Sequence, residues 1–349
     1  METKAAILVE LNRPLELVDL TIPPLRAGQV LVELAYSGVC HTQLLEVRGY
    51  RGPDPFLPHG LGHEASGRVV ELGAEVTKVR VGDRVICSWM KGTGSNVPGC
   101  QYRWQNKTVN AGGITTFQQY AVISENRLTR LPDTIDDRIA ALLGCAIPTG
   151  VGAVRNTANI HAGQSVAVFG TGGVGLCAVA AAALAGANPL IAVDLHPQRL
   201  ELAQRLGANL LINPTDSDPR EAIRQQLPAG LDWAIEASGR PQVMELALSC
   251  VRDRGGSVVV VGNARAGEKL QIDPRELNQG KRLLGTWGGD NEPDRDFPQY
   301  CEWIASGKLN VRPLVEQIYS LDQINVALAD LETARVARPL ILTGPSLNG

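Results

Sequence analysis

The stretch from Ser165 to Asp194 constrains the fold of this chain more than any other. It opens with an apolar, β-branched run and continues into a glycine-rich turn and an alanine-rich run with high helix propensity. A second apolar run, Leu190–Val193, ends at Asp194. The turn contains Gly170, Gly172, Gly173, Val174 and Gly175. Strand, glycine turn, helix, strand and acid in this order predict a dinucleotide-binding βαβ unit, and a glycine turn without a ligand is the alternative.

Each part of this unit has a physical role in holding a cofactor. Gly170 permits a tight turn, Gly172 lets the backbone approach a pyrophosphate, and Gly175 lets the helix pack closely against the strand. The helix N-terminus offers N–H groups and a partial positive charge to the phosphates. Asp194 lies 19 residues beyond Gly175, the place of an acid that binds the adenosine ribose and repels a 2′-phosphate. We therefore expect NAD rather than NADP.

The 349 residues suggest two domains, and the sequence pattern changes once along the chain. Residues 1–147 carry short β-branched or alternating runs separated by glycine and proline, which predict a barrel-like β domain. From 148 to 287, predicted strands alternate with predicted helices, as in a doubly wound parallel α/β sheet. We assign residues 288–349 to the β domain. The segment 92–113 is polar and glycine-rich and is expected to be a loop.

Composition excludes several classes of function. The net charge is −3 and no basic run reaches five residues, which argues against a nucleic-acid partner. No uncharged apolar stretch is long enough to span a membrane, and the N-terminus lacks the pattern of a signal peptide. The seven cysteines are scattered and odd in number, which suits reduced thiols or metal ligands better than a disulfide framework. We expect a cytoplasmic protein that acts on a small molecule.

Three separated residues are candidate ligands of one metal ion: Cys40, His63 and Cys145. Two thiolates and one imidazole suit zinc, and three protein ligands leave a fourth position for water or substrate. Such a zinc is a Lewis acid that assists hydride transfer between an alcohol and a carbonyl. Cysteines are also common in apolar cores, which is the simplest interpretation of the remaining ones outside 92–113: Cys87, Cys177, Cys250 and Cys301.

Together these motifs resemble the zinc-dependent medium-chain alcohol dehydrogenases over essentially the whole chain. The resemblance is carried by GVCHT (38–42), GHEASGRVVELG (62–73), VGDRV (81–85), LLGC with TG (142–150) and FGTGGVG (169–175). It implies a GroES-like catalytic domain beside a Rossmann domain, a single catalytic zinc on Cys40, His63 and Cys145, and a homodimer or homotetramer.

The resemblance also implies roles for residues around the zinc and the cofactor. Glu64 would approach the metal during ligand exchange, and Thr42 would hydrogen-bond the substrate oxygen and pass on its proton. Trp89 would line the substrate pocket, where ordinary core packing is the alternative. Thr149 would touch the nicotinamide, Arg199 the adenosine ribose, and Arg338 the pyrophosphate.

Two histidines, His41 and His59, have alternative interpretations. His41 would point away from the metal if its segment is extended, and a basic residue here meets the cofactor phosphates in some relatives. His59 precedes His63 by four positions, which on a helix would suggest a metal-binding pair, but Gly60 and Gly62 between them argue against a helix. A metal-ligand or substrate role for His59 is the alternative that we keep.

The sequence departs from the family pattern at two places. The segment 92–113 holds a single cysteine, Cys100, so we expect no structural zinc. Position 45, often a proton-relaying histidine, is Leu45, and position 43, often an aspartate, is Gln43. A neutral amide beside the metal would make it a stronger Lewis acid. These differences disfavour ethanol-type activity and make a polyol, a sugar or a cyclitol the candidate substrates.

The sequence thus predicts an NAD- and zinc-dependent alcohol dehydrogenase. One alternative is an NADH-dependent reductase of carbonyls or activated alkenes in a biosynthetic pathway. Another, from a different class, is a non-catalytic NAD-binding protein.

Overall fold

The computed structural model describes residues 1–344, which form two compact units. Within the described residues, unit 1 comprises Met1–Cys145, Glu292–Ala305 and 315–344, and unit 2 comprises Ala146–Asn291 and Ser306–Leu314. The expected boundaries at 148 and 287 lie close to the observed ones. Residues 306–314, however, group with unit 2 rather than with the β domain. Positions 345–349 of the predicted β domain lie outside the described residues.

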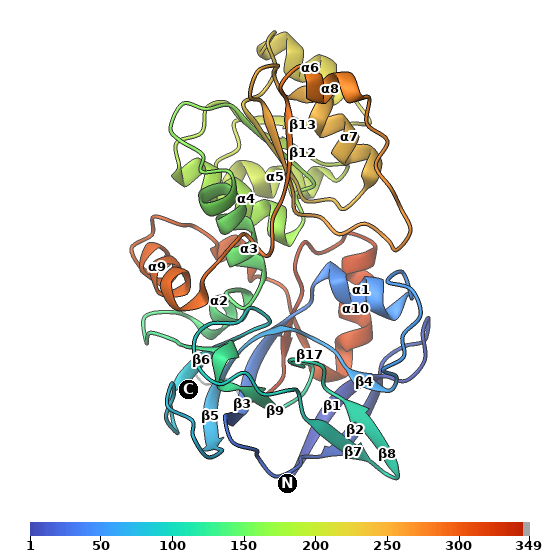
Figure 1. Cartoon of the computed structure of the whole chain (residues 1–349), viewed down its shortest axis with the longest axis vertical. Helices are drawn as coiled ribbons and strands as arrows, with labels where there is room; N and C mark the ends of the chain where they lie inside the picture. The colour runs from blue at the N-terminus through green and yellow to red at the C-terminus, as the bar shows by residue number, and fades with distance from the viewer. Residues whose placement is uncertain (345–349) are drawn as a thin grey trace. The chain divides into compact units, whose positions relative to one another are not determined.

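Unit 1 contains two sheets, as expected for a barrel-like β domain. Its strands are β1 (Glu2–Leu8), β2 (Glu16–Thr21), β3 (Gln29–Gly38), β4 (His59–Gly60), β5 (Glu64–Leu72), β6 (Arg84–Ser88), β7 (Gln101–Trp104), β8 (Lys107–Asn110), β9 (Tyr120–Ser124), β10 (Leu128–Arg130), β17 (Ile318–Ser320) and β18 (Leu340–Leu342). A closed barrel has the order β1-β2-β7-β8-β4 (Figure 1). The other sheet has seven strands in the order β10-β6-β5-β3-β18-β17, with β9 also paired to β3.

Four α-helices belong to unit 1, and one of them corrects an expectation. They are α1 (His41–Val47), α2 (Asp137–Leu142), α9 (Pro293–Ala305) and α10 (Ile324–Glu332). The extended conformation considered for His41 is therefore wrong. The apolar spacing of Leu44 and Val47 suits a helix with one buried face, and both side chains are buried.

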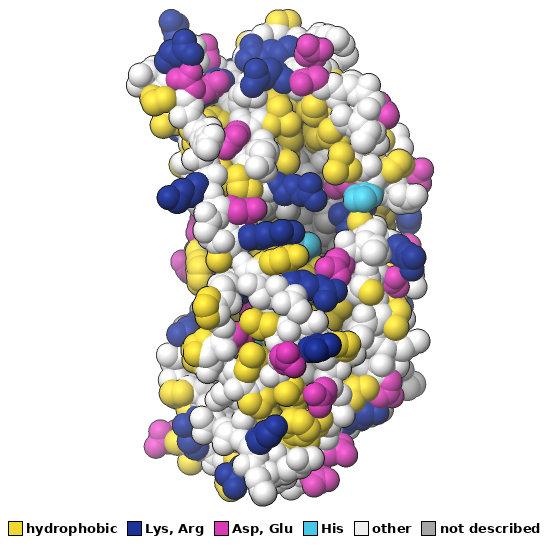
Figure 2. All heavy atoms as spheres, turned by 90° about the vertical axis from the view of Figure 1, so that its right-hand side faces the viewer, with side chains coloured by type: hydrophobic (Ala, Val, Ile, Leu, Met, Phe, Trp, Pro, Cys, Tyr) yellow, Lys and Arg dark blue, Asp and Glu magenta, His cyan; other side chains and the backbone are white. Residues whose placement is uncertain are grey.

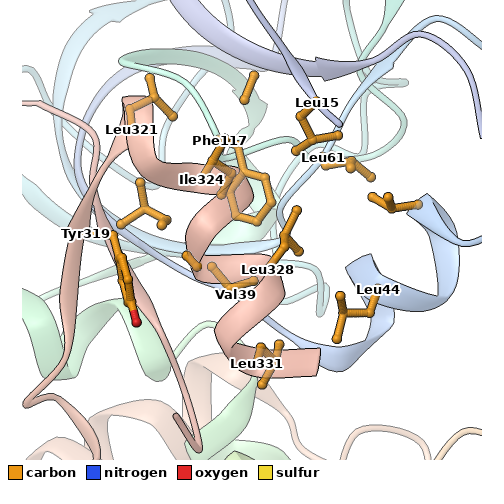
Figure 3. Packing of buried hydrophobic residues seen from close by; sticks show 14 of the residues in the cluster. Leu15, Val39, Leu44, Leu61, Phe117, Tyr319, Leu321, Ile324, Leu328 and Leu331 are labelled. Carbon is orange, nitrogen blue, oxygen red and sulfur yellow. The ribbon is translucent and has the colours of Figure 1, made fainter. Parts of the chain in front are cut away.

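An apolar cluster joins α1 to the C-terminal helix α10. Figure 3 shows Leu44 of α1 on the side of α10 that carries Leu328 and Leu331, and Phe117 beside Ile324 and Leu328. Val39 and Leu61, which stand next to or near the predicted metal ligands, belong to the same cluster and are at most 3% exposed. Buried apolar contacts therefore fix the backbone on which two of the predicted ligands lie.

The segment 92–113 is not wholly a loop, because β7 and β8 form an antiparallel hairpin within it. Tyr102 and Val109 are directly opposite each other and at most 1% exposed. The phenolic oxygen of Tyr102 accepts hydrogen bonds from Gln118 and from the backbone N–H of Val122, both at 2.9 Å. Strands of four residues in a polar context show too little alternation to be recognised in the sequence.

A single buried carboxylate holds the first part of this segment. Glu125, in the 3-10 turn Glu125–Arg127, is 1% exposed and accepts hydrogen bonds from the backbone N–H of Ser95 at 2.9 Å. Its other oxygen accepts from the backbone N–H groups of Thr77 at 2.9 Å and Lys78 at 3.0 Å. Burial by itself raises the pKa of Glu125, but these donors outweigh burial and hold the pKa below its ordinary value.

We expect Glu125→Gln to destabilise the protein by about 1–3 kcal/mol, because it removes acceptor capacity from buried N–H groups. Since the pKa of Glu125 is lower in the folded than in the unfolded protein, its stabilisation is present above the unfolded pKa and is lost as the pH falls through the folded pKa. Urea unfolding over an acidic pH series measures both effects. The control Glu71→Gln, at an exposed position of β5, should leave stability nearly unchanged. Equal stability of the Glu125 and Glu71 variants would contradict the role given to Glu125.

Unit 2 is built around one parallel sheet of six strands (Figure 1). The strands are β11 (Val166–Phe169), β12 (Leu190–Val193), β13 (Leu210–Ile212), β14 (Trp233–Glu236), β15 (Ser257–Val260) and β16 (Arg282–Gly285). Their order, β13-β12-β11-β14-β15-β16, is that of a doubly wound dinucleotide-binding sheet, as predicted. The helical segments are α3 (Ala146–Gly152), the π-helical Ala153–Thr157, α4 (Gly173–Leu184), α5 (Pro197–Arg205), α6 (Pro219–Gln226), α7 (Pro241–Cys250) and α8 (Pro274–Asn278), with a 3-10 turn at Arg312–Leu314.

The surface carries charges of both signs. On the face shown in Figure 2, basic and acidic side chains are interspersed with apolar ones rather than segregated. None of the helices within residues 1–344 has the length and apolar character needed to cross a bilayer.

Candidate functional site

The predicted ligands Cys40, His63 and Cys145 meet in unit 1. They come from three separate places: the start of α1, the connection between β4 and β5, and the segment between α2 and α3. Their ligand atoms all lie within 4.8 Å of one another, and His63 Nε2 is 3.2 Å from Cys145 Sγ. Cys40 and Cys145 are buried and His63 is half-buried.

Strand register explains why these segments meet. Near the end of β3, Ser37 pairs with Ala65 of β5, and Gly38 pairs with Leu340 of β18. The same end of the sheet therefore carries Cys40, His63, Glu64 and Arg338.

One hydrogen bond and one glycine hold the backbone beside two of the ligands. The Ser88 hydroxyl of β6 donates to the carbonyl of Gly144 at 2.7 Å and so anchors the residue before Cys145. Gly62 has a φ of +87°, and a Cβ there would lie 2.3 Å from Thr116 Oγ1, so only glycine fits beside His63.

The chemistry of this donor set fits zinc. Two sulfur atoms and one imidazole nitrogen are a typical catalytic set, which leaves one coordination position for a substrate oxygen. The contact with Cys145 lowers the pKa of the Cys40 thiol well below its ordinary value, against the effect of burial, and the positive charge of Arg338 lowers it further. Cys40 is therefore prepared to act as a thiolate ligand.

A buried ion pair lies next to the cysteines. Arg338 donates from Nη2 to Glu64 Oε1, and the two side chains are 3% and 0% exposed. Burial alone would lower the pKa of Arg338, but the charges of Glu64, Cys40 and Cys145 outweigh it and raise the pKa. Glu64, predicted to approach the metal, thus lies beside the metal ligands. Arg338, predicted to contact the pyrophosphate, is instead buried against Glu64 in this structure.

The remaining residues predicted near the metal occupy different environments. Thr42 Oγ1 lies 3.6 Å from Cys40 Sγ, while His41 is exposed at the start of α1. Trp89 directly follows β6 and is half-buried, and its carbonyl accepts a hydrogen bond from Arg127 Nη1.

His59 lines a pocket of about 480 Å³ that also reaches His63 and Gln43. His59 Nε2 is 2.8 Å from Asp54 Oδ2, and its Nδ1 is 2.8 Å from the carbonyl oxygen of Gly60. Both ring nitrogens are therefore engaged within the protein, which leaves His59 as a pocket-lining residue and not a member of the metal-ligand cluster.

Sequence reasoning missed the other charged residues of this pocket. Arg51 Nη1 donates to Glu46 Oε1 at 2.7 Å, and both residues line the pocket with Asp54. Arg51 and Asp54 stand in a segment rich in glycine and proline that has no recognisable motif, and Glu46 lies near the end of α1. Only their proximity to His59 in the chain could have indicated them.

The glycine turn of unit 2 has the geometry of a phosphate cradle. Gly170 has a φ of +85°, and a Cβ there would lie 2.8 Å from the backbone nitrogen of Ser238. A Cβ on Gly175 would lie 1.9 Å from the carbonyl oxygen of Gly170, so the start of α4 packs directly on the turn. Around Gly172, by contrast, a Cβ would meet nothing within 4 Å, which leaves room for a pyrophosphate at the N-terminus of α4.

The residues predicted around the adenosine and nicotinamide groups also lie in unit 2. Asp194 follows β12 and accepts hydrogen bonds from the backbone N–H groups of Thr171 at 2.7 Å and His196 at 2.9 Å. Burial lowers the pKa of the half-buried Arg199, and the charge of Asp194 partly opposes this. The buried Thr149 hydroxyl has no hydrogen-bond partner among the described residues, so it is available to a ligand.

Comparison with known proteins matches both units. The family model of the alcohol dehydrogenase GroES-like domain matches residues 26–133, and that of the zinc-binding dehydrogenase matches residues 173–306. Proteins named S-(hydroxymethyl)glutathione dehydrogenase from Synechocystis sp. and from Photobacterium damsela subsp. piscicida are each 33% identical, over 98% of this chain and 100% of their own length.

Solved structures match over similar spans. The benzyl alcohol dehydrogenase of Acinetobacter calcoaceticus has a TM-score of 0.89 and 30% identity, over 99% of this chain and 100% of its own. The 2R,3R-butanediol dehydrogenase of Bacillus subtilis has a TM-score of 0.80 and 26% identity, over 97% of this chain and 99% of its own.

Proposed function

The chain belongs to the zinc-dependent medium-chain alcohol dehydrogenases, and we propose that it uses NAD to interconvert a polar, hydroxyl-rich alcohol and its carbonyl compound. The family establishes alcohol oxidoreduction assisted by zinc, and therefore favours an enzyme over a non-catalytic NAD-binding protein. Beyond the family, we propose which cofactor accepts the hydride, which class of alcohol is the substrate and which residues move the proton. The observation that carries it is the cluster of Cys40, His63 and Cys145, of which His63 lines a pocket together with charged side chains.

The three ligands would hold zinc, which supplies a Lewis acid at the substrate oxygen. Oxidation removes a hydride from the alcohol carbon and a proton from its oxygen. We assign the proton to Thr42, whose hydroxyl lies beside Cys40 Sγ at 3.6 Å. Leu45 is buried and apolar and cannot relay a proton, whereas the exposed His41 at the start of α1 can exchange one with solvent. Glu64, paired with Arg338, would keep a negative charge near the ligands.

Several features of unit 2 support NAD as the hydride acceptor. The open space at Gly172 and the start of α4 suit a pyrophosphate, and the carboxylate of Asp194 at the end of β12 suits the hydroxyls of an adenosine ribose. We assign Arg199 to the same ribose and the unpartnered Thr149 hydroxyl to the nicotinamide.

The charged pocket supports a polar substrate. An ion pair of Arg51 with Glu46 lines it, and so does His59, which is hydrogen-bonded to Asp54. A hydroxyl group can donate to a carboxylate and accept from a guanidinium at the same time, so a polyol, a sugar or a cyclitol can satisfy the carboxylates and the Arg51 guanidinium. A purely aromatic or alkyl alcohol would leave them without ligand partners when it displaces water.

A substrate screen tests this proposal. Zinc-loaded protein is supplied with NAD or NADP, and the reduced nicotinamide formed with cyclitols, sugar alcohols and benzyl alcohol is measured by absorbance. We expect turnover with NAD, and kcat/KM for the preferred polyol about tenfold or more above that for benzyl alcohol. Asp54→Ala should narrow this ratio, whereas Asp133→Ala, at a fully exposed side chain, should not. Faster turnover with NADP than with NAD would refute the cofactor assignment. A higher kcat/KM for benzyl alcohol than for every polyol, in the unmodified protein and in Asp133→Ala alike, would refute the substrate class.

We also propose that the chain forms a homo-oligomer through unit 2, as the family resemblance implies. The outermost strand β16 of the parallel sheet pairs with β15, and Trp287 just beyond it is 79% exposed. A strand edge and a large apolar side chain are features of a surface that another copy can cover.

A further inference from the structure

Gln43 connects two of the metal ligands through one amide group. It lies on α1, three residues after Cys40, and is 1% exposed. Its Oε1 accepts a hydrogen bond from the backbone N–H of Cys40 at 2.8 Å, and its Nε2 lies 2.7 Å from His63 Nδ1.

The chemistry of these partners determines which way the amide faces. A backbone N–H can only donate, so the oxygen of Gln43 must face Cys40 and the NH₂ group must face His63. The NH₂ group has no lone pair to offer, so His63 Nδ1 must accept. In a neutral imidazole the single proton then lies on Nε2, the nitrogen that is 3.2 Å from Cys145 Sγ.

A zinc-bound imidazole needs the opposite arrangement. Nε2 faces the thiols, so it would bind the metal through its lone pair and the ring proton would move to Nδ1. The Nδ1–H group would then meet the NH₂ group of Gln43, which is a second donor. Turning the amide over would supply an acceptor to His63 but would direct the NH₂ group at the backbone N–H of Cys40. In either orientation one N–H group faces another.

We propose that Gln43 is a positioning residue that secures His63 in the metal-free site and weakens the retention of zinc. A carboxylate at position 43 would accept from Cys40 and His63 simultaneously and would remove the conflict. The proposal rests on the assignment of Cys40, His63 and Cys145 as zinc ligands.

Zinc affinity measured by competition with a chelator tests the proposal. Gln43→Glu should bind zinc about 10–100-fold more tightly than the unmodified protein, the range by which outer hydrogen-bond partners change metal affinity. Gln43→Met should bind zinc no more weakly than the unmodified protein, because the bond that it removes opposes the metal-bound ring. The control Gln101→Glu adds the same charge at an exposed position of β7 and should leave the affinity unchanged.

The position of the ring proton tests the hydrogen-bond argument without any metal. In nitrogen-15 NMR spectra of the chelator-treated protein, we expect the proton of neutral His63 on Nε2, and in Gln43→Glu on Nδ1. A proton on Nδ1 in the unmodified protein would overturn the proposal, and so would a Gln43→Met variant that binds zinc tenfold more weakly. Failure of all these proteins to bind zinc would overturn the ligand assignment as well. Equal zinc affinity of Gln43→Glu and the unmodified protein would overturn only the role of Gln43.

Discussion

Cys145→Ala is expected to lose stoichiometric zinc and to lower kcat/KM with the preferred alcohol by about a thousandfold or more. Cys145 Sγ is one of three ligand atoms within 4.8 Å of one another, and alanine leaves only Cys40 and His63. A Lewis acid at the substrate oxygen contributes several kcal/mol to stabilisation of the transition state, which corresponds to a factor of this size. Metal analysis of the purified protein and steady-state kinetics measure the two effects separately.

Cys87→Ala is the matched control for this experiment. Cys87 is another fully buried cysteine of unit 1, on β6, and burial raises the pKa of its thiol strongly, which is typical of an inert core residue. This variant should keep its zinc and most of its activity. A Cys145→Ala protein that retains zinc and full activity would show that the ligands have been misassigned.

Glu64→Gln is expected to lower the free energy of unfolding by about 3–5 kcal/mol, because it removes the carboxylate that pairs with the buried guanidinium of Arg338. The arginine cannot release its proton to escape this cost. In addition, its Nε atom has no hydrogen-bond partner among the described residues. Urea unfolding of the variant and the unmodified protein, both freed of metal, measures the difference.

Two further variants separate the effect of burial from that of charge. Combining Glu64→Gln with Arg338→Met removes both charges and should recover a substantial part of the lost stability. The exposed pair Arg48–Glu332 provides the matched control, since its side chains are 35% and 38% exposed. Glu332→Gln should cost less than about 1 kcal/mol. If Glu64→Gln and Glu332→Gln had equal effects, the buried pair would not have the importance given to it here.

Local sequence signals were sufficient for the long, regular parts of the fold. The apolar run Leu190–Val193 of the predicted βαβ unit is β12 with the same bounds, and the alanine-rich run that precedes it forms α4. These elements combine an apolar pattern with a proline or glycine at their ends, so neighbouring residues alone specify them.

Short elements escaped prediction because distant residues stabilise them. The seven residues of α1 are held by Leu44 and Val47 in a cluster with α10, nearly three hundred residues away in the chain. The four-residue strands β7 and β8 depend on the buried contacts of Tyr102 and Val109. A window of neighbouring residues contains none of these contacts.

The sequence by itself determined the ligand types and the dinucleotide turn, because both follow from residue chemistry: thiols and imidazole for zinc, glycines and an acid for NAD. Only the tertiary structure decided which side chains surround them. The register of β3 with β5 and β18 brings Glu64 and Arg338 to Cys40, and the fold of unit 1 places Asp54 and His59 in one pocket with His63. It also decided that Gln43 joins Cys40 to His63, since hydrogen bonds between segments depend on distances that spacing along the chain does not contain.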